Sequence, residues 1–223
     1  MKTCAIITAA GQGKRMGRPK QFIKLGAKSL LERTLSVFER SEAINGIILV
    51  VNPEDIRKTK KFRMRKLVKV VAGGKERQDS VYNGLKALPE DAEMVVIHDG
   101  ARPFVTAEII KRAVTEAKTY KAVLVGVPVT DTIKRVIGGR LMVSGTVDRS
   151  QLWAAQTPQV FKKNVIFKAY AHGRKEPATD DAMLVEKMGI PVKMVMGSYE
   201  NIKITTVEDL KIAEALLSRS AAS

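Results

Sequence analysis

The sequence predicts an α/β protein built on a three-layer, doubly wound and mostly parallel sheet. Short apolar segments rich in β-branched residues alternate with helical patterns along the 223-residue chain. Most of these segments are apolar on both faces, which is typical of strands that helices cover on both sides. A glycine-rich turn follows the first segment directly, at the edge of the sheet where such folds bind ligands.

Six segments are expected to form the strands: 3–9, 46–51, 67–73, 94–99, 122–129 and 192–197. Helices are expected over 29–40, 76–88 and 206–217, because apolar residues recur there at helical spacing. In the first of them Leu31, Leu35 and Phe38 share one side. The third opens with the capping pattern Thr206-x-x-Asp209. Because no repeat or linker divides the chain, residues 1–223 are expected to form a single domain.

One segment interrupts the alternation of strands and helices. Residues 130–149 contain β-prone stretches on both sides of Gly138-Gly139, which is typical of a hairpin turn. We therefore expect a protruding β-arm at about residues 130–150. Its apolar residues exceed what a two-stranded ribbon can shield from water. The arm is expected to pack against a second subunit or, as the alternative, to cover its own domain as a flap.

The formal net charge of +16 indicates an anionic partner, and nucleic acid, an acidic surface and a polyphosphate substrate are the candidates. Residues 57–69 hold eight cationic side chains but one aromatic residue, Phe62, and no nucleic-acid-binding motif surrounds them. This basic run is expected to be a solvated helix face and turn. A basic RNA-binding protein remains the alternative from another class.

Cysteine content and hydropathy narrow the class of protein. The single cysteine, Cys4, lies in the first apolar segment, where a buried thiol is expected. No stretch is long and apolar enough for a secretory signal or a membrane helix. A cytoplasmic protein without membrane association is the resulting expectation.

The candidate binding and catalytic residues are concentrated in residues 7–20, ITAAGQGKRMGRPK, and at Asp99. The three glycines of this loop follow neither the dinucleotide-binding nor the Walker spacing. Between residues 9 and 31, however, six cationic residues occur without a carboxylate, which favours a polyanion site. Asp99 ends an apolar strand, where one carboxylate together with substrate phosphates suits Mg²⁺, whereas a helix N-cap or an ion pair with Arg102 is the alternative. The residues therefore indicate Mg²⁺-dependent nucleotidyl or phosphoryl transfer.

Six segments resemble the signature segments of the 2-C-methyl-D-erythritol 4-phosphate cytidylyltransferases: AAGQGKRMGRPKQF, GGKERQDSV, HDGARP, DTIKR, TVDRSQLWAAQTPQ and NIKIT. The resemblance extends from about residue 3 to 215. It implies a fold of the nucleotide-diphospho-sugar transferase type. It also implies transfer of CMP from CTP to 2-C-methyl-D-erythritol 4-phosphate, which gives 4-diphosphocytidyl-2-C-methyl-D-erythritol and pyrophosphate in the non-mevalonate route to isoprenoid precursors.

The resemblance implies a CTP site at the edge of the sheet. The triphosphate would lie on the backbone of Gly11 and Gly13, and Arg15 and Lys20 would stabilise the charge that develops at the α-phosphorus. Asp99 would hold Mg²⁺ or another divalent cation. The other residues implied to bind CTP are Ala9, Ala10, Gly74, Ser80 and Gly100.

The resemblance also implies a site for the polyol phosphate and a homodimer joined through the arm. Arg102, Thr157 and Lys203 would bind this substrate, and Thr132 and Arg149 would reach in from the arm of the partner subunit. Arg149 and Lys203 would direct the phosphate nucleophile toward CTP. No general base is needed, because a phosphate oxygen is already ionised near neutral pH.

The nearest alternative enzyme is ribitol-5-phosphate cytidylyltransferase, which shares the glycine loop and the segments QTPQ and NIKIT. The arm segments DTIKR and TVDR resemble those of the methylerythritol enzymes better. Two positions depart from the family pattern: Gly100 replaces a usual alanine, and Lys75 stands near the expected ribose, where an acidic residue is frequent. Lys75 is therefore not counted as a ligand.

Overall fold

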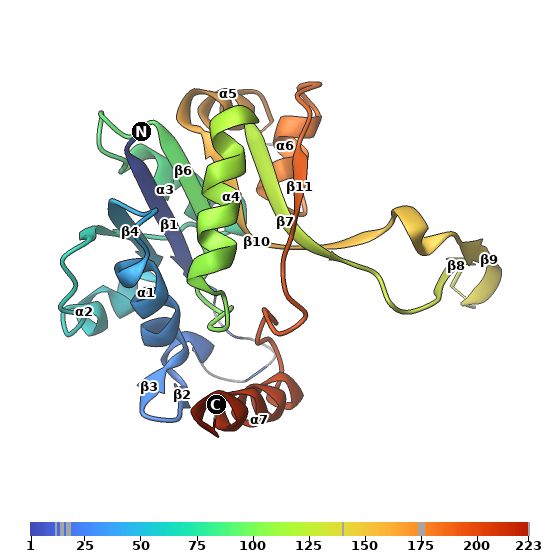
Figure 1. Cartoon of the computed structure of the whole chain (residues 1–223), viewed down its shortest axis with the longest axis horizontal. Helices are drawn as coiled ribbons and strands as arrows, with labels where there is room; N and C mark the ends of the chain where they lie inside the picture. The colour runs from blue at the N-terminus through green and yellow to red at the C-terminus, as the bar shows by residue number, and fades with distance from the viewer. Residues whose placement is uncertain (12, 14–15, 17–18, 140, 174–176, 223) are drawn as a thin grey trace.

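The computed structural model describes the chain except for residues 12, 14–15, 17–18, 140, 174–176 and 223. The strands of its central sheet are β1 (Thr3–Ala9), β4 (Gly46–Val51), β5 (Leu67–Ala72), β6 (Met94–Asp99), β7 (Ala122–Pro128), β10 (Trp153–Lys162) and β11 (Lys193–Met196). They lie in the order β11-β7-β10-β6-β1-β4-β5 (Figure 1). Neighbouring strands are parallel except at β10, which is antiparallel to both β6 and β7. The sheet is therefore mostly parallel, as predicted.

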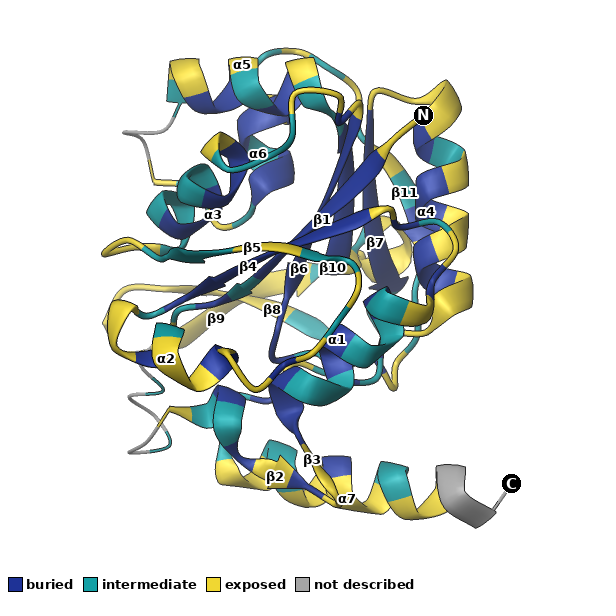
Figure 2. Cartoon of the chain, turned by 90° about the vertical axis from the view of Figure 1, so that its left-hand side faces the viewer, coloured by how far each residue is buried: buried dark blue, intermediate teal, exposed yellow. Residues whose placement is uncertain are grey.

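Helices cover both faces of this sheet, so the predicted three layers are confirmed. The helices are α1 (Leu30–Arg40), α2 (Ile56–Thr59), α3 (Arg77–Lys86), α4 (Ala107–Thr119), α5 (Lys163–Gly173), α6 (Asp181–Glu186) and α7 (Val207–Ala222). Helices α1 and α4 pack on one face, whereas α3, α5 and α6 pack on the other (Figure 2). Because side chains alternate along a strand, Ile7 of β1 joins the first of these cores and Ile6 joins the second.

The predicted cap at Thr206 is present, and α1 has a further cap that was not predicted from the sequence. In α1 the side chain of Ser29 accepts the N–H of Glu32, and the Glu32 carboxylate accepts the N–H of Ser29. In α7 the N–H of Asp209 donates to Thr206 Oγ1, and the Asp209 carboxylate accepts the N–H of Thr206. Both helices therefore begin with reciprocal caps. Among the described residues, no helix combines the length and the hydropathy needed to cross a bilayer.

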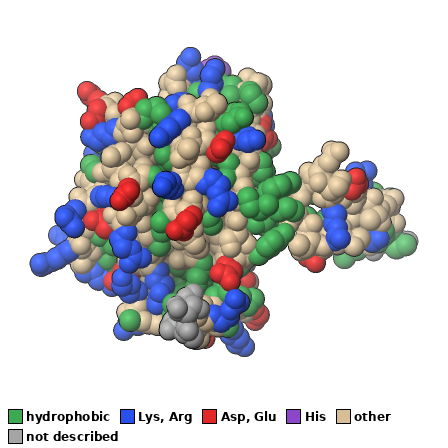
Figure 3. All heavy atoms as spheres, viewed as in Figure 1, with side chains coloured by type: hydrophobic (Ala, Val, Ile, Leu, Met, Phe, Trp, Pro, Cys, Tyr) green, Lys and Arg blue, Asp and Glu red, His purple; other side chains and the backbone are tan. Residues whose placement is uncertain are grey.

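An antiparallel ribbon of β8 (Ile133–Ile137) and β9 (Met142–Val147) lies within the segment for which an arm is predicted. Its turn contains Gly138 with a φ of +66°, a conformation that glycine adopts readily. The ribbon extends away from the rest of the molecule (Figure 1, Figure 3), and its large hydrophobic side chains are exposed. A second short pair, β2 (Lys24–Leu25) and β3 (Lys28–Ser29), packs against α7.

Strand β10 is absent from the six strands that the sequence predicts. Its Pro158 has no N–H to donate to the ladder, and proline normally argues against a central strand. The structure accommodates Pro158 at a register shift between Ala155 and Gln159. The basic run agrees with its prediction, because its side chains are mostly exposed on α2 and the following turn, while Phe62 is buried in the core. Cys4 is buried, as expected.

Candidate active site

The glycine-rich loop follows β1, at the carboxyl ends of the parallel strands. Gly13 has a φ of +65°, which L side chains rarely adopt, and its carbonyl accepts the N–H of Met16 at 2.8 Å. Arg15, expected to act on the α-phosphate, lies outside the described residues. Lys20 Nζ donates to the carbonyl of Ile204 at 2.9 Å. The loop is therefore joined to a segment that is remote in the sequence.

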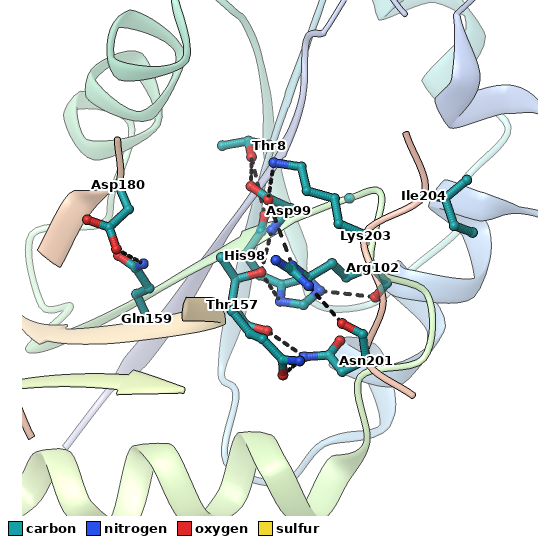
Figure 4. Close-up of polar contacts among 12 residues, drawn as sticks. Thr8, His98, Asp99, Arg102, Thr157, Gln159, Asp180, Asn201, Lys203 and Ile204 are labelled. Carbon is teal, nitrogen blue, oxygen red and sulfur yellow. Dashed lines mark hydrogen bonds and ion pairs between the residues drawn. The ribbon is translucent and has the colours of Figure 1, made fainter. Parts of the chain in front are cut away.

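Asp99 is the last residue of β6 and lies beside Thr8 of β1 in the parallel register. Its side chain is buried, and both carboxylate oxygens face polar partners (Figure 4). Oδ2 lies 2.7 Å from Lys203 Nζ and 4.0 Å from Arg102 Nε. Oδ1 lies 3.4 Å from Thr8 Oγ1 and 3.4 Å from Arg77 Nε. Cations from separate parts of the chain thus converge on one carboxylate.

The surrounding charges decide the protonation state of Asp99. Burial favours the neutral carboxyl, but attraction to Arg77 and Lys203 outweighs burial and holds its pKa well below the usual range. Asp99 is therefore ionised at neutral pH. The ion pair with Arg102, which the sequence leaves as an alternative, is present but longer than the pair with Lys203.

Thr157 of β10 holds the backbone of Asp99 in place through its hydroxyl group. Its Oγ1 accepts the backbone N–H of Asp99 at 3.1 Å and lies 3.0 Å from His98 Nδ1. Burial lowers the pKa of His98 to about 4, so the ring is neutral at pH 7. The threonine hydroxyl has one hydrogen to give, and this donates to Nδ1, which leaves the Nε2 hydrogen for the carbonyl of Arg102 at 3.2 Å. His98 is therefore a structural histidine with both ring nitrogens hydrogen-bonded.

The loop after β5 approaches the loop after β1, as a shared nucleotide site requires. A Cβ on Gly73 would lie 2.3 Å from the Cβ of Ala10, so only glycine permits this approach. The N–H of Gly74 donates to Ser80 Oγ at 3.1 Å, and Ser80 Oγ donates to the carbonyl of Glu76 at 3.2 Å. The Ser80 hydroxyl, expected to contact cytosine, thus holds the shape of this loop.

The remaining predicted nucleotide residues lie at the same edge of the sheet. Ala9 ends β1, exposed Gly11 follows two residues later, and Gly100 follows Asp99. The N–H of Gly100 donates to the carbonyl of Thr8 at 2.9 Å, which fixes the turn after β6. The backbone groups assigned to CTP are therefore gathered around the ends of β1 and β6.

The segment before α7 supplies the opposite wall of the site. Arg102 Nη1 donates to the carbonyl of Asn201 at 2.7 Å, and the N–H of Ile204 donates to the carbonyl of Ala101 at 2.9 Å. Asn201 is buried, and its Nδ2 donates to the carbonyl of Thr157 at 2.9 Å. These contacts fix the backbone on both sides of Lys203.

Two predicted substrate residues lie elsewhere in the chain. Thr132 directly precedes β8, and Arg149 follows β9 by two residues. Both side chains are exposed, and Arg149 Nη1 donates to the carbonyl of Thr130. The β8–β9 ribbon that these residues flank extends away from the sheet (Figure 1).

The donor set fits a metal ion that a bound substrate helps to hold. Among the described residues, no group of three or more His, Cys, Asp or Glu side chains is placed to bind a metal. Asp99 offers one ionised carboxylate beside a loop suited to phosphates. Mg²⁺ prefers one or two carboxylates together with phosphate oxygens over a site made of protein alone.

A parallel sheet with its polar residues at the carboxyl ends of adjacent strands β1 and β6 belongs to the nucleotide-binding class of α/β enzymes. A sequence model of the 2-C-methyl-D-erythritol 4-phosphate cytidylyltransferases matches residues 3–219. The chain belongs to this family.

Individual relatives agree with this placement over nearly the full length. The chain is 51% identical to the 2-C-methyl-D-erythritol 4-phosphate cytidylyltransferase of Geobacillus thermodenitrificans, with 96% of each chain covered. It is 49% identical to that of Alkaliphilus metalliredigens, with 98% of this chain and 94% of the relative covered. The crystal structure of 4-diphosphocytidyl-2C-methyl-D-erythritol synthase from Anaerococcus prevotii superposes with a TM-score of 0.87 at 35% identity and covers 97% of this chain and 98% of its own.

Sequence reasoning did not identify Arg77 as part of this site. Its Nε faces Asp99, and its Nη2 lies 2.8 Å from Asp181 Oδ2. Arg77 belongs to the quoted segment GGKERQDSV, so its position in a signature segment was the available signal. Its partner Asp181 is more than 100 residues away in the chain, and the pairing depends on how α3 and α6 pack.

Proposed function

We propose that this protein transfers CMP from CTP to 2-C-methyl-D-erythritol 4-phosphate in non-mevalonate isoprenoid precursor synthesis. Membership of the cytidylyltransferase family supports this activity, because the family model matches residues 3–219 and the relative from Geobacillus thermodenitrificans is similar over 96% of the chain. The single observation that carries the proposal is the buried, ionised Asp99, which lies beside Thr8 of β1 and faces Lys203, Arg102 and Arg77. Ribitol-5-phosphate transfer and RNA binding are not favoured.

In the proposed reaction an ionised phosphate oxygen of the acceptor attacks the α-phosphorus of CTP. A new P–O bond forms in line with the bond to the β-phosphate, which breaks and releases pyrophosphate. Lys20, together with Arg15, would stabilise the charge on the α-phosphate. Lys203 and Arg102 would bind the acceptor phosphate. Since Lys20 Nζ contacts the carbonyl of Ile204, the cations for the two substrates are fixed relative to each other.

Asp99 would hold Mg²⁺ together with phosphate oxygens of CTP. When bound, the ion would neutralise negative charge on the triphosphate. The low pKa of Asp99 keeps the carboxylate ready for this role. The Lys203 side chain is 40% exposed, so it can exchange its pairing with Asp99 for the acceptor phosphate when that anion arrives.

We also propose that the active form is a homodimer with exchanged arms. The ribbon exposes Val136, Ile137, Leu141, Met142 and Val143, which are 48–75% accessible. A two-stranded ribbon cannot bury these side chains by itself, and contact with a second subunit would cover them. In that arrangement Thr132 and Arg149 of one chain would complete the acceptor site of the other.

Pyrophosphate release tests the proposed reaction. The purified protein is supplied with Mg²⁺ and CTP, and methylerythritol phosphate and ribitol 5-phosphate are offered in parallel, with ATP, GTP and UTP as nucleotide controls. We expect release with CTP and methylerythritol phosphate alone. Faster release with ribitol 5-phosphate would contradict the assigned acceptor, and no release with either acceptor would contradict the enzyme assignment.

A further inference from the structure

The Oδ1 atom of Asp99 contacts Thr8 and Arg77, and Arg77 is the charged partner of the two. Arg77 is the first residue of α3, and its guanidinium is shared between two carboxylates. Nε lies 3.4 Å from Asp99 Oδ1, whereas Nη2 lies 2.8 Å from Asp181 Oδ2. Asp99 Oδ2 is thereby left facing Lys203 and Arg102, on the side of the acceptor site.

Asp181, the second carboxylate that contacts Arg77, is anchored in the core. The Asp181 side chain is fully buried at the start of α6, and its Oδ1 accepts the hydroxyl of Tyr170 from α5 at 2.5 Å. Tyr170 is buried and stacks on Tyr82 of α3, with ring centroids 6.1 Å apart. A buried carboxylate needs a fixed counter-charge, and Arg77 supplies it. The position of the guanidinium is therefore set by three helices rather than by Asp99.

We propose that Arg77 is a positioning residue, which Asp181 and Tyr170 hold in place so that Asp99 presents Oδ2 to the metal–nucleotide complex. This inference rests on the proposed function, because it assigns the Arg77 contact to the proposed divalent-cation site. If both oxygens of Asp99 were free, the carboxylate could rotate. Because the anchored guanidinium of Arg77 holds Oδ1, the carboxylate is restricted to one orientation. Residues behind a metal ligand commonly contribute about 10-fold to 100-fold to metal affinity in this way.

The readout is the gain in CTP affinity that Mg²⁺ confers. Calorimetric titration of CTP, without any acceptor, gives a dissociation constant with Mg²⁺ and another with EDTA, and their ratio is the gain. We expect Arg77→Met to reduce the gain by about 10-fold or more while the value in EDTA stays close to that of the wild type. Arg77→Lys, which keeps the charge but loses the fork, should lie between the two.

Asp181→Asn tests the anchor, because Asp181 does not contact Asp99 and the substitution keeps the shape of the side chain. We expect a smaller reduction of the gain, and no further reduction when it is added to Arg77→Met. Tyr170→Phe, which removes only the hydroxyl, should act in the same direction. Asp180→Asn is the matched control, since Asp180 precedes Asp181 but bonds Gln159 and caps α6.

Circular dichroism and melting curves verify that each variant is folded. The inference is overturned if Arg77→Met retains the gain, if Asp181→Asn behaves as Asp180→Asn does, or if CTP affinity falls equally with Mg²⁺ and with EDTA, as a general structural defect would cause. A wild-type protein without any gain would instead overturn the proposed metal site, and this inference with it.

Discussion

Thr157 shows how a residue assigned to a substrate can act through another residue. Its hydroxyl accepts the N–H of Asp99 and donates to His98, so its hydrogen is already committed. The side chain is 4% exposed. The geometry therefore indicates that Thr157 supports the end of β6, and that its influence on the acceptor site passes through Asp99.

Thr157→Val separates these two roles. Valine has the same shape but leaves the Asp99 N–H and His98 Nδ1 buried without partners. We expect the free energy of unfolding to fall by about 3 kcal/mol, at about 1–3 kcal/mol for each buried unsatisfied group, with a lower kcat. Chemical denaturation and steady-state kinetics measure both. Thr157→Ser should retain most of the stability, whereas unchanged stability with a raised KM for the acceptor would show direct substrate contact instead.

Individual site residues could be predicted where a signature segment or a strand end marks them. Asp99 is recognisable as a carboxylate at the end of an apolar strand, and Lys20 as a cation in a loop without acids. The contacts of Arg77 with Asp181, and of Lys203 with Asp99, depend on side-chain directions across the fold. No local pattern contains that information, because the partners are about 100 residues apart in the chain.

At the scale of elements, the two loops assigned to the proposed nucleotide site depend on Gly73 for their close approach. An added Cβ would lie 2.3 Å from the Cβ of Ala10 and 2.9 Å from Ser80 Oγ, so the loops after β1 and β5 would have to separate. We expect Gly73→Ala to raise the KM for CTP by about 10-fold or more, since small displacements of positioning groups have large effects. Initial rates measured over a range of CTP concentrations provide the test.

Gly139→Ala is the control for this substitution. A Cβ at residue 139 would meet no atom within 4 Å. Its KM for CTP should therefore remain that of the wild type. An unchanged KM in Gly73→Ala would mean that the loops can separate without loss of the nucleotide site.

The cap of α7 has a pH-dependent effect on stability. Burial opposes ionisation of Asp209, but its carboxylate accepts the Thr205 hydroxyl and the N–H groups of Thr205 and Thr206, and these hydrogen bonds hold its pKa below the ordinary value of 3.8. A carboxyl whose pKa is lower in the folded protein stabilises it above the unfolded pKa and loses this effect as the pH falls. The cap follows Lys203 closely, so it also supports the wall of the site.

We expect Asp209→Asn to lower the free energy of unfolding by about 1 kcal/mol at pH 7. The difference from the wild type should shrink as the pH falls below 3.8, because the wild-type carboxyl then becomes protonated. Urea denaturation at several pH values measures it. Glu214→Gln, an exposed substitution on the same helix, should show a difference near zero at pH 7. An equal deficit of Asp209→Asn at all pH values would contradict a role for its charge.

The elements differed in how well the sequence predicted them. Strands β1, β4 and β6 are largely apolar segments rich in β-branched residues, and they lie where expected. Strand β10 was missed because Pro158 and polar residues interrupt its pattern. The packing of β6 and β7 on both sides supplies the order that local propensity does not. Tertiary contact thus outweighed the local signal at the strand that carries Thr157.

For the whole molecule, the alternation of strands and helices predicted the fold class. It did not predict whether one chain contains every residue of the active site. The part of the chain outside the arm, which we call the body, brings Lys20, Lys203 and Asp99 together through contacts within one chain. The β8–β9 ribbon, which Arg149 follows in the chain, extends away from the central sheet (Figure 1). If the arm completes the site of another subunit, residues of the body must act in cis with each other and in trans with Arg149.

Mixing inactive variants tests this arrangement. Lys20→Ala and Arg149→Ala chains are refolded together, and a heterodimer then contains one site with both residues intact. With random pairing, half of the dimers are heterodimers and half of their sites are intact, so we expect about a quarter of wild-type activity. Pyrophosphate release measures it, and differently tagged chains verify the heterodimer.

A mixture of Lys20→Ala and Lys203→Ala is the matched control. Lys20 and Lys203 belong to the same site within one chain, because Lys20 Nζ contacts the carbonyl of Ile204, next to Lys203. Every site of that heterodimer would lack one of the two lysines, so its activity should stay at the level of the separate variants. Recovery in this control, or no recovery with Arg149→Ala despite verified heterodimers, would show that the arm does not contribute Arg149 in trans.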